Sequence, residues 1–226
     1  MTLCLVTDRR RLAGSEASAD LSHACLLEQA RFAVDAGVDL IQVRERDLDA
    51  APLSALVRDI VGLTRGTATR VVVNDRLDVA LASGADGVHL RGDSMTAADA
   101  RRLAPAGFLI GRSVHAVAEA VRAHGADYLI AGTVFRSPSK PGHERLLGLE
   151  GLMSIAHATS TPVLAIGGVT EARFGEIAAA GAAGLAAIGL FLGAGSASNR
   201  PGCRAASLRR LVESARRRFD SLKTAP

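Results

Sequence analysis

The sequence predicts an α/β protein that folds as a single (β/α)8 TIM barrel. Two observations predict this fold. Similar Gly-containing tetrapeptides recur at residues 36–39, 83–86, 124–127 and 180–183, each after a helix-like segment and before an apolar run. Glycine just past a helix supplies the positive φ that ends it, so the recurrence indicates repeated βα units. The apolar runs lack polar alternation, which is typical of parallel strands buried on both faces.

The elements follow in order from these boundaries. Short apolar runs between turn residues predict strands at residues 3–7, 40–44, 70–74, 87–90, 109–113, 128–132, 163–166 and 184–188. Helical spacing predicts helices at residues 24–36, 51–64, 77–82, 96–103, 116–124, 149–158 and 171–180. This alternation favours a closed barrel. The alternative is an open doubly wound sheet, but no Gly-x-Gly-x-x-Gly follows the first strand.

The barrel is expected to span residues 1–192, which are followed by a small, polar stretch. Residues 193–203 are predicted to be a flexible connector, and residues 204–226 an amphipathic C-terminal helix packed on the barrel. Leu208, Leu211, Val212, Ala215 and Phe219 recur there at helical spacing. The arginines of this helix could meet nucleic acid, but a solvated face is the preferred interpretation.

Composition limits the classes of function. Hydrophobic residues make up 48% of the chain and aromatic residues 3%, so the core must be aliphatic and base-stacking modules are disfavoured. The net charge of +4 fits anionic small molecules as well as it fits nucleic acid. Because aromatic residues are scarce, we expect phosphorylated small molecules as partners and no nucleic acid. No signal peptide and no membrane-spanning run is recognised, so we expect a cytoplasmic protein without a membrane partner. A homo-oligomer remains possible.

Cationic residues follow two of the predicted strands. In the segment Gln42-Val43-Arg44-Glu45-Arg46, alternation points Gln42, Arg44 and Arg46 to one side. Buried arginines must be neutralised, either by acids such as Glu45 or by a bound phosphate, and the sequence leaves both open. After residues 128–132, a loop carries Ser137, Ser139 and Lys140, a combination of donors that suits phosphate.

Other strand ends carry further candidates. Asn74 or Asp75 could cap a helix, or Asp75 and Asp93 could bind Mg²⁺. His115 lies one step past a strand, where an acid/base is expected, and nearby Ser113 is either part of the site or a helix cap. His89 is expected to be a satisfied interior histidine. Gly167 and Gly168 allow backbone N–H groups to approach an anion, and Ile188-Gly189 ends the last strand, a usual phosphate position in barrels.

Several segments together resemble the thiamine phosphate synthase/TenI superfamily: Val6-Thr7-Asp8 and residues 42–46, 74–76, 87–90, 135–140 and 165–168. In a synthase of this superfamily, a pyrimidine pyrophosphate ionises and a thiazole phosphate captures the carbocation. The resemblance implies that Asp75 and Asp93 hold Mg²⁺ and that Arg44 and Lys140 stabilise the leaving group. By motif, the pyrimidine pyrophosphate would be held by Gln42, Val43, Arg44, Glu45, Arg46, Asn74, Ser113 and Lys140. The thiazole phosphate would be held by Ser137, Ser139, Gly167, Gly168, Ile188 and Gly189.

The chain departs from the synthase pattern in ways that keep alternatives open. Arg46 stands where a lysine is usual, Ser137 and Ser139 replace threonines, and the second acidic ligand usually lies at the position of Ser94 rather than Asp93. Residues 111–115 look more like the TenI branch, whose tautomerases aromatise a carboxythiazole phosphate with the histidine, here His115, as acid/base and without metal. A third possibility is a non-catalytic regulator that binds thiamine intermediates. Asn74-Asp75 and the cationic set favour the synthase.

Overall fold

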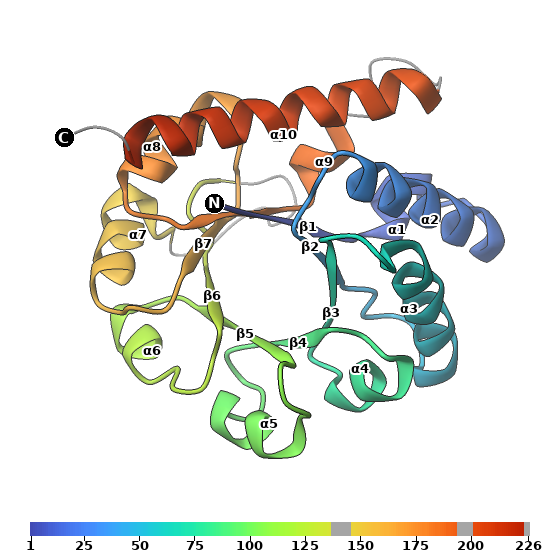
Figure 1. The fold of residues 1–226 in the computed structure, drawn as a ribbon, viewed down its shortest axis with the longest axis horizontal. Coiled ribbons are helices and arrows are strands. Elements are labelled where there is room, and N and C mark those ends of the chain that lie inside the picture. The colour runs from blue at the N-terminus through green and yellow to red at the C-terminus, as the bar shows by residue number, and fades with distance from the viewer. Residues whose placement is uncertain (137–145, 194–200, 224–226) are drawn as a thin grey trace.

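The structure, a computed structural model, describes residues 1–136, 146–193 and 201–223. It is a closed barrel of parallel strands in sequence order, with β1 paired to β8 (Figure 1). The strands are β1 Thr2–Val6, β2 Leu40–Val43, β3 Arg70–Asn74, β4 Gly87–Leu90, β5 Leu109–Val114, β6 Tyr128–Ala131, β7 Val163–Ile166 and β8 Gly184–Ala187. The predicted (β/α)8 barrel is confirmed, and each strand boundary lies within one residue of its expected position.

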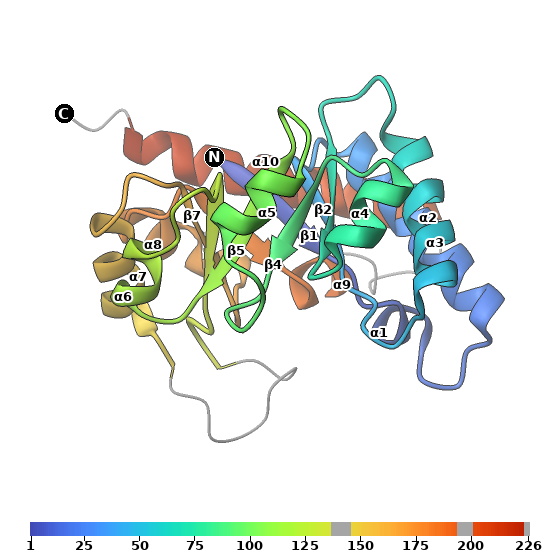
Figure 2. The same ribbon diagram turned by 90° about the horizontal axis from the view of Figure 1, so that it is seen from below.

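Helices surround the barrel. Those predicted from the sequence are α2 Ala19–Asp35, α3 Ala50–Thr64, α4 Leu77–Ser83, α5 Ala97–Leu103, α6 Val117–Val121, α7 Gly148–His157 and α8 Phe174–Ala179, the last preceded by the 3-10 turn η1 Glu171–Arg173. Two short helices were not expected: α1 Arg9–Ala13 after β1 and α9 Gly189–Gly193 after β8. Figure 2 shows both at the end of the barrel opposite the N-terminus.

The C-terminal helix α10, Pro201–Lys223, packs between α8 and α2 and so completes the ring of helices (Figure 1). It begins at Pro201, three residues before the expected start, because proline is well suited to the first turn of a helix. Residues 194–200 of the expected connector lie outside the described residues. In the described part of the chain, no helix is long and apolar enough to cross a membrane.

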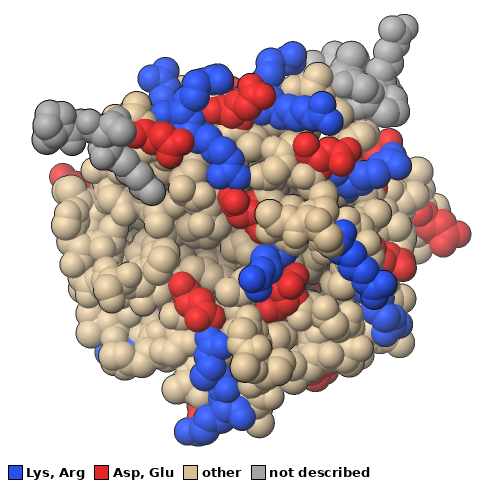
Figure 3. Space-filling model, viewed as in Figure 1, with Lys and Arg blue, Asp and Glu red and all other residues tan. Residues whose placement is uncertain are grey.

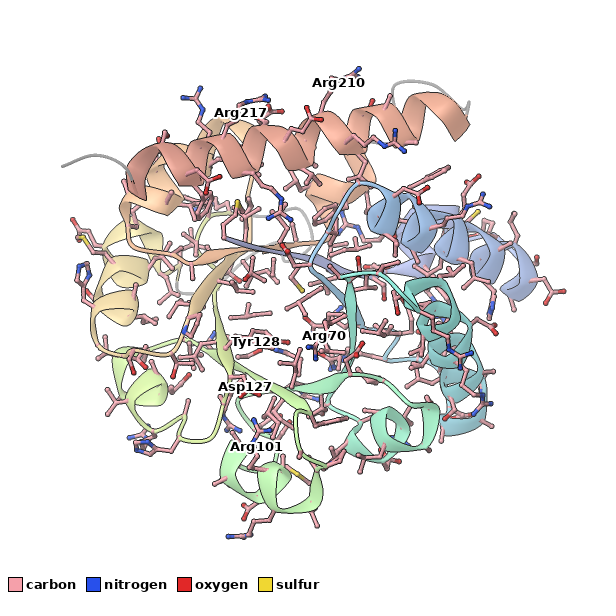
Figure 4. All side chains as sticks on the ribbon, viewed as in Figure 1. Arg70, Arg101, Asp127, Tyr128, Arg210 and Arg217 are labelled. Carbon is pink, nitrogen blue, oxygen red and sulfur yellow. The ribbon has the colours of Figure 1, made fainter. Side chains whose placement is uncertain are left out.

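The core has two parts. Inside the barrel, alternate strand residues form a cluster of Cys4, Val6, Leu40, Val72, Tyr128, Ile130, Leu164 and Ala186, and the intervening residues pack outward against the helices. Gly111 leaves room for two rings in this interior: a Cβ there would lie 2.2 Å from Cζ of Tyr128 and 2.5 Å from Nδ1 of His89. Figure 4 shows Tyr128 directed into the barrel. A larger residue at position 111 would therefore displace His89, which faces the cavity described below.

Three of the four repeated tetrapeptides end in an aspartate that links the N-terminal ends of two neighbouring strands. The carboxylates of Asp39, Asp86 and Asp127 each accept a backbone N–H, from Leu3, Val71 and Ile110 respectively, at 2.7 Å in every case. We call these three interactions the aspartate clasps. Asp127 also pairs with Arg101 at 2.6 Å, and Figure 4 shows these two side chains together. The fourth repeat has Ala183 instead, which has no carboxylate and is joined to β7 by the backbone hydrogen bond from its N–H to the carbonyl oxygen of Val163.

Candidate active site

A cavity of about 1330 Å³ opens at the C-terminal ends of the strands. All eight strands or the loops that follow them contribute lining residues, including Asp8 after β1, Asn74 on β3 and Gly189 after β8. This is the end of a parallel barrel where enzymes of this fold build their active sites. The opposite face, seen in Figure 3, carries acidic and basic side chains next to one another, with Lys and Arg gathered along the edge formed by α10.

Most of the described residues proposed from the sequence line this one cavity. They are Gln42, Arg44, Arg46, Asn74, Asp93, Ser113, His115, Gly167, Gly168, Ile188 and Gly189. Three others do not line it: Val43 and Glu45 on the opposite side of β2, and Asp75, which lines a smaller neighbouring cavity of about 220 Å³ together with them. Ser137, Ser139 and Lys140 lie outside the described residues.

Arg44 and Arg46 bring positive charge to the cavity wall without a matching acid. Among the described residues, no carboxylate lies within ion-pair distance of either guanidinium. Burial lowers the pKa of Arg44, and the positive charges of Arg46 and Arg91 lower it further, against the opposing effects of Asp8 and Glu45. Arginine remains protonated under all ordinary conditions, so the result is a crowded set of cations that favours a polyanionic ligand.

Glu45 neutralises Arg9 rather than Arg44. Its carboxylate accepts hydrogen bonds from Oγ1 of Thr7 at 2.6 Å and from Nη1 of Arg9 at 3.0 Å. Burial raises the pKa of Glu45, while the bonds from Thr7 and Arg9 act in the opposite direction. Thr7 Oγ1 in turn accepts the backbone N–H of Arg44 at 2.9 Å. Glu45 therefore fixes the end of β2 from outside the cavity, and Arg44 keeps its charge for a ligand.

His89 lies at the base of the cavity and holds two hydroxyl groups. Its Nε2 is 2.9 Å from Oγ of Ser113, and its Nδ1 is 3.3 Å from the hydroxyl of Tyr128. Burial, reinforced by the charge of Arg112, lowers the pKa of His89 to about 3. The ring is thus neutral near pH 7, as expected for an interior histidine. Because it bonds Ser113, it also sets the direction of a hydroxyl that faces the cavity.

His115 follows β5 at the cavity wall, and its hydrogen bonds define which ring nitrogen carries a proton. Its Nδ1 is hydrogen-bonded to the backbone carbonyl oxygen of Gly132, and its backbone N–H donates to Oε2 of Glu119 at 2.7 Å. A carbonyl oxygen only accepts, so Nδ1 must carry the proton. In the neutral ring, Nε2 then has an available lone pair, which is the form required of a general base.

Gly167 and Gly168 form the turn after β7, with φ of 98° and 62°. A Cβ on Gly168 would lie 2.4 Å from the carbonyl oxygen of Arg136, and one on Gly167 would lie 2.4 Å from Cγ2 of Thr133. Only glycine allows this turn to pack so closely on the loop that follows β6. The bare backbone borders the cavity, as a phosphate site needs.

Four residues after β3 and β4 form a closed network that we call the Asp75 cluster. The carboxylate of Asp75 accepts from the hydroxyl of Ser94 through Oδ1 and lies 3.4 Å from Nη1 of Arg91 through Oδ2. Arg91 Nη2 bonds Asp93 at 2.5 Å, and the Arg91 backbone N–H donates to Ser94 Oγ at 3.0 Å. Asp93 is 70% exposed at the rim, and Arg91 borders both cavities.

Several cavity residues were not identified from the sequence. Arg91 is one, because its direction is set by Asp75 and Asp93 and not by strand alternation. Another is Arg210 on α10, which contributes to the cavity lining and donates to Ser207 Oγ at 3.2 Å. It is exposed, as the helical pattern predicted, and Figure 4 shows its side chain on the outer side of α10. Asp8 and Arg11 also line the cavity. The motif Val6-Thr7-Asp8 was the available signal for the first of these.

Comparison with known proteins places the chain among relatives of one kind. The family model described as thiamine monophosphate synthase matches residues 3–191. A protein named thiamine-phosphate synthase from Methanoregula boonei is 45% identical over 174 residues, which cover 76% of this chain and 79% of the relative. A putative thiamine-phosphate synthase from Geobacter sulfurreducens is 41% identical over 189 residues, covering 83% and 84%.

Solved structures agree with this placement. The thiamine phosphate pyrophosphorylase from Pyrococcus furiosus superposes with a TM-score of 0.75 at 34% sequence identity, covering 95% of this chain and 96% of that one. A thiamine phosphate pyrophosphorylase from Bacteroides thetaiotaomicron has a TM-score of 0.66 at 18% identity and supports the fold alone. With a family model spanning almost the whole barrel and relatives above 40% identity, the chain belongs to the thiamine monophosphate synthase family.

Proposed function

We propose that the protein is a thiamine-phosphate synthase, a transferase that couples a hydroxymethylpyrimidine pyrophosphate to a thiazole phosphate and releases pyrophosphate. Family membership supports the reaction. The observation that carries the proposal is the set of Arg44, Arg46 and Arg91 on the same cavity as the Gly167-Gly168 turn. Two anionic substrates need two such regions. The substrates are therefore phosphorylated small molecules, and the proposed setting is the cytoplasm.

The arginines would act on the bond that breaks. The C–O bond between the pyrimidine methylene and the pyrophosphate cleaves, and its electron pair leaves with the pyrophosphate oxygen. The thiazole nitrogen then supplies the pair that forms the new C–N bond. Negative charge develops on the leaving group, so fixed guanidinium groups at that place stabilise the transition state more than the substrate. Arg44, crowded by Arg46 and partly buried, is the best placed of the described cations.

The remaining residues would orient the substrates. Gln42 donates through Nε2 to Oδ1 of Asn74 at 3.1 Å, and the Oε1 atom of Gln42 is buried without a partner among the described residues, so it can accept a hydrogen bond from the pyrimidine. Ser113, fixed by His89, can donate to the pyrophosphate. The Gly167-Gly168 backbone would take the thiazole phosphate. Lys140, Ser137 and Ser139 stay predictions for these two anion sites.

Magnesium is implied by the resemblance, with Asp75 and Asp93 as ligands. The residues present do not fit it well: both oxygens of Asp75 are engaged, by Ser94 and Arg91, and Asp93 is paired with Arg91. Nor do three or more His, Cys, Asp or Glu side chains that could hold a metal gather anywhere in the described ranges. No step of the proposed reaction is therefore assigned to a metal.

A thiazole tautomerase is the second candidate, and His115 is the observation that favours it. With Nδ1 bound to the carbonyl of Gly132, the ring can offer Nε2 as a base at the cavity wall. Tautomerisation moves protons on the thiazole ring and needs such a group, whereas coupling does not. Binding of thiamine intermediates without turnover is the third possibility.

Assays of both reactions with two variants separate these candidates. In a synthase, Arg44→Ala should lower coupling by roughly 10²–10³-fold, the usual cost of removing a transition-state donor, and His115→Ala should cost much less. In a tautomerase, His115→Ala should lower proton transfer by about 10²–10⁴-fold. Arg102→Ala, on the exposed side of α5 and paired with Asp99, is the matched charge control. Wild-type protein that tautomerises but never couples would refute the synthase, and binding without either reaction would indicate the regulator.

A further inference from the structure

The Asp75 cluster places a fixed organic cation where a divalent metal is expected. Arg91 lies between two carboxylates, with Nη1 toward Asp75 and Nη2 toward Asp93. Ser94 closes the network because it accepts the Arg91 backbone N–H and donates to Asp75. Arg91 is thereby held at both its backbone and its guanidinium group.

The same contacts make the Asp75 cluster a poor magnesium site. Mg²⁺ requires near-octahedral oxygen ligands at about 2.0–2.1 Å, supplied by one or two carboxylates together with substrate oxygens. Here Asp75 is bonded through both oxygens, and Asp93 turns to the rim with its side chain 70% exposed. Glu45, which lines the smaller cavity with Asp75, is bonded to Thr7 and Arg9. A dication at Asp75 would also have to displace the guanidinium from the carboxylate that holds it.

The position of Arg91 suits a role on the leaving group. Its side chain borders the main cavity, and its charge acts on Arg44, whose pKa it helps to lower. Arg44 and Arg46 follow β2 and Arg91 follows β4, with β3 between them, and all three line the same cavity. A guanidinium has several N–H donors, so Arg91 can bond a phosphate oxygen while it keeps its carboxylates.

We infer that Arg91 takes the charge-neutralising place of the divalent cation, so that this protein binds pyrophosphate and releases it in catalysis without Mg²⁺. The inference rests on the proposed synthase function for its catalytic part. No proton is transferred in the step: the C–O bond breaks, the electron pair goes to the pyrophosphate oxygen, and Arg91 donates hydrogen bonds to the anion that forms. Asp75, Asp93 and Ser94 are the positioning residues for its guanidinium.

The experiment measures binding of inorganic pyrophosphate by calorimetry, in excess chelator and again with Mg²⁺. Wild-type protein should bind in chelator, and Arg91→Gln should bind about 10- to 100-fold more weakly, as expected for the loss of a charged hydrogen-bond donor. The charge control is Arg102→Gln, which should behave as wild type. Because Arg91 is 40% exposed at a rim, its replacement should leave the fold intact, which a melting curve checks.

A double variant removes the guanidinium and restores the acidic residue that the synthase pattern has at position 94. Arg91→Gly with Ser94→Asp removes the guanidinium and adds a carboxylate beside Asp75. We expect it to bind pyrophosphate only when Mg²⁺ is present. Equal binding of wild type and double variant in chelator would overturn the inference.

Coupling assays on wild-type protein then distinguish the two proposals. Coupling that persists in chelator supports both the synthase and the role of Arg91. Coupling that appears only with Mg²⁺ leaves the synthase standing and overturns the inference. Absence of coupling under both conditions refutes the synthase, while pyrophosphate binding still decides whether Arg91 replaces the metal at this anion site.

Discussion

His89 should make the stability of the protein depend on pH in a way that one substitution removes. The ring is buried at the base of the cavity, and burial lowers its pKa from 6.5 to about 3. In the unfolded chain the same ring takes up a proton below about pH 6.5. Between these values the unfolded state binds more protons than the folded state, so the free energy of unfolding falls as the pH falls. The contribution of the neutral ring to the free energy of unfolding is complete above pH 6.5 and is lost as the pH falls toward 3.

The size of the effect follows from the interval. Each pH unit between the two pKa values is worth about 1.4 kcal/mol, so acidification from pH 6.5 to pH 4 should remove roughly 3 kcal/mol through His89 alone. Glutamine at position 89 does not titrate and can still bond Ser113 or Tyr128. The variant should be less stable than wild type at pH 7 because it loses ring packing, and this deficit should shrink as the pH falls.

Urea unfolding at a series of pH values from 7 to 4 measures the difference directly. His89→Gln and wild type are compared at each pH, so that the carboxylates, which titrate in both proteins, cancel. His157→Gln, which changes an exposed histidine on α7, is the control and should keep a constant offset from wild type. Parallel curves for wild type and His89→Gln would refute the assignment of a buried neutral ring at this position.

Two further predictions concern the backbone. Gly168→Ala places a side chain at a φ of 62° and 2.4 Å from the carbonyl oxygen of Arg136, so we expect it to lose at least about 1–2 kcal/mol of stability and to bind phosphate more weakly in calorimetry. The control, Gly175→Ala, lies in α8 with open space around it and should be neutral or stabilising. An equal melting temperature in both variants would contradict the steric argument. Asp127→Ala removes an aspartate clasp and should lower the free energy of unfolding, measured in urea, by about 1–3 kcal/mol. Because Asp127 lies on the face opposite the cavity, kcat should be unchanged. A fall in kcat at full stability would show that the two faces are coupled.

The barrel could be predicted because its signals are local. Gly37, Gly84, Gly125 and Gly181 all have positive φ at the ends of helices, which the repeated tetrapeptides indicated directly. The short helices α1 and α9 escaped prediction for the opposite reason. Arg9–Ala13 has no buried residue, and Gly189–Gly193 starts and ends with glycine, so neither has a helical pattern that five residues could reveal.

In the candidate active site too, residues placed by local patterns could be predicted and residues placed by tertiary contacts could not. Gln42, Arg44 and Arg46 could be assigned to one side of a strand because alternation is a property of the strand itself. The partner of Arg44 could not be chosen, since Glu45 turns to Arg9, which is far away in sequence. Arg91 was missed because a loop residue takes its direction from tertiary contacts, here Asp75 and Asp93.

The aspartate clasps divide the barrel into quarters. Each joins an odd-numbered strand to the even-numbered strand that follows: Asp39 joins β1 and β2, Asp86 joins β3 and β4, and Asp127 joins β5 and β6. The fourth quarter, β7 and β8, has Ala183 at the same place and relies there on a backbone hydrogen bond of 2.7 Å. Local opening begins where cross-links are fewest, so amide hydrogens at the N-terminal end of β7 should exchange before their counterparts in the other three quarters. The four repeated tetrapeptides, one of which lacks its aspartate, therefore predict that the four quarters of the barrel do not open in local unfolding at the same time.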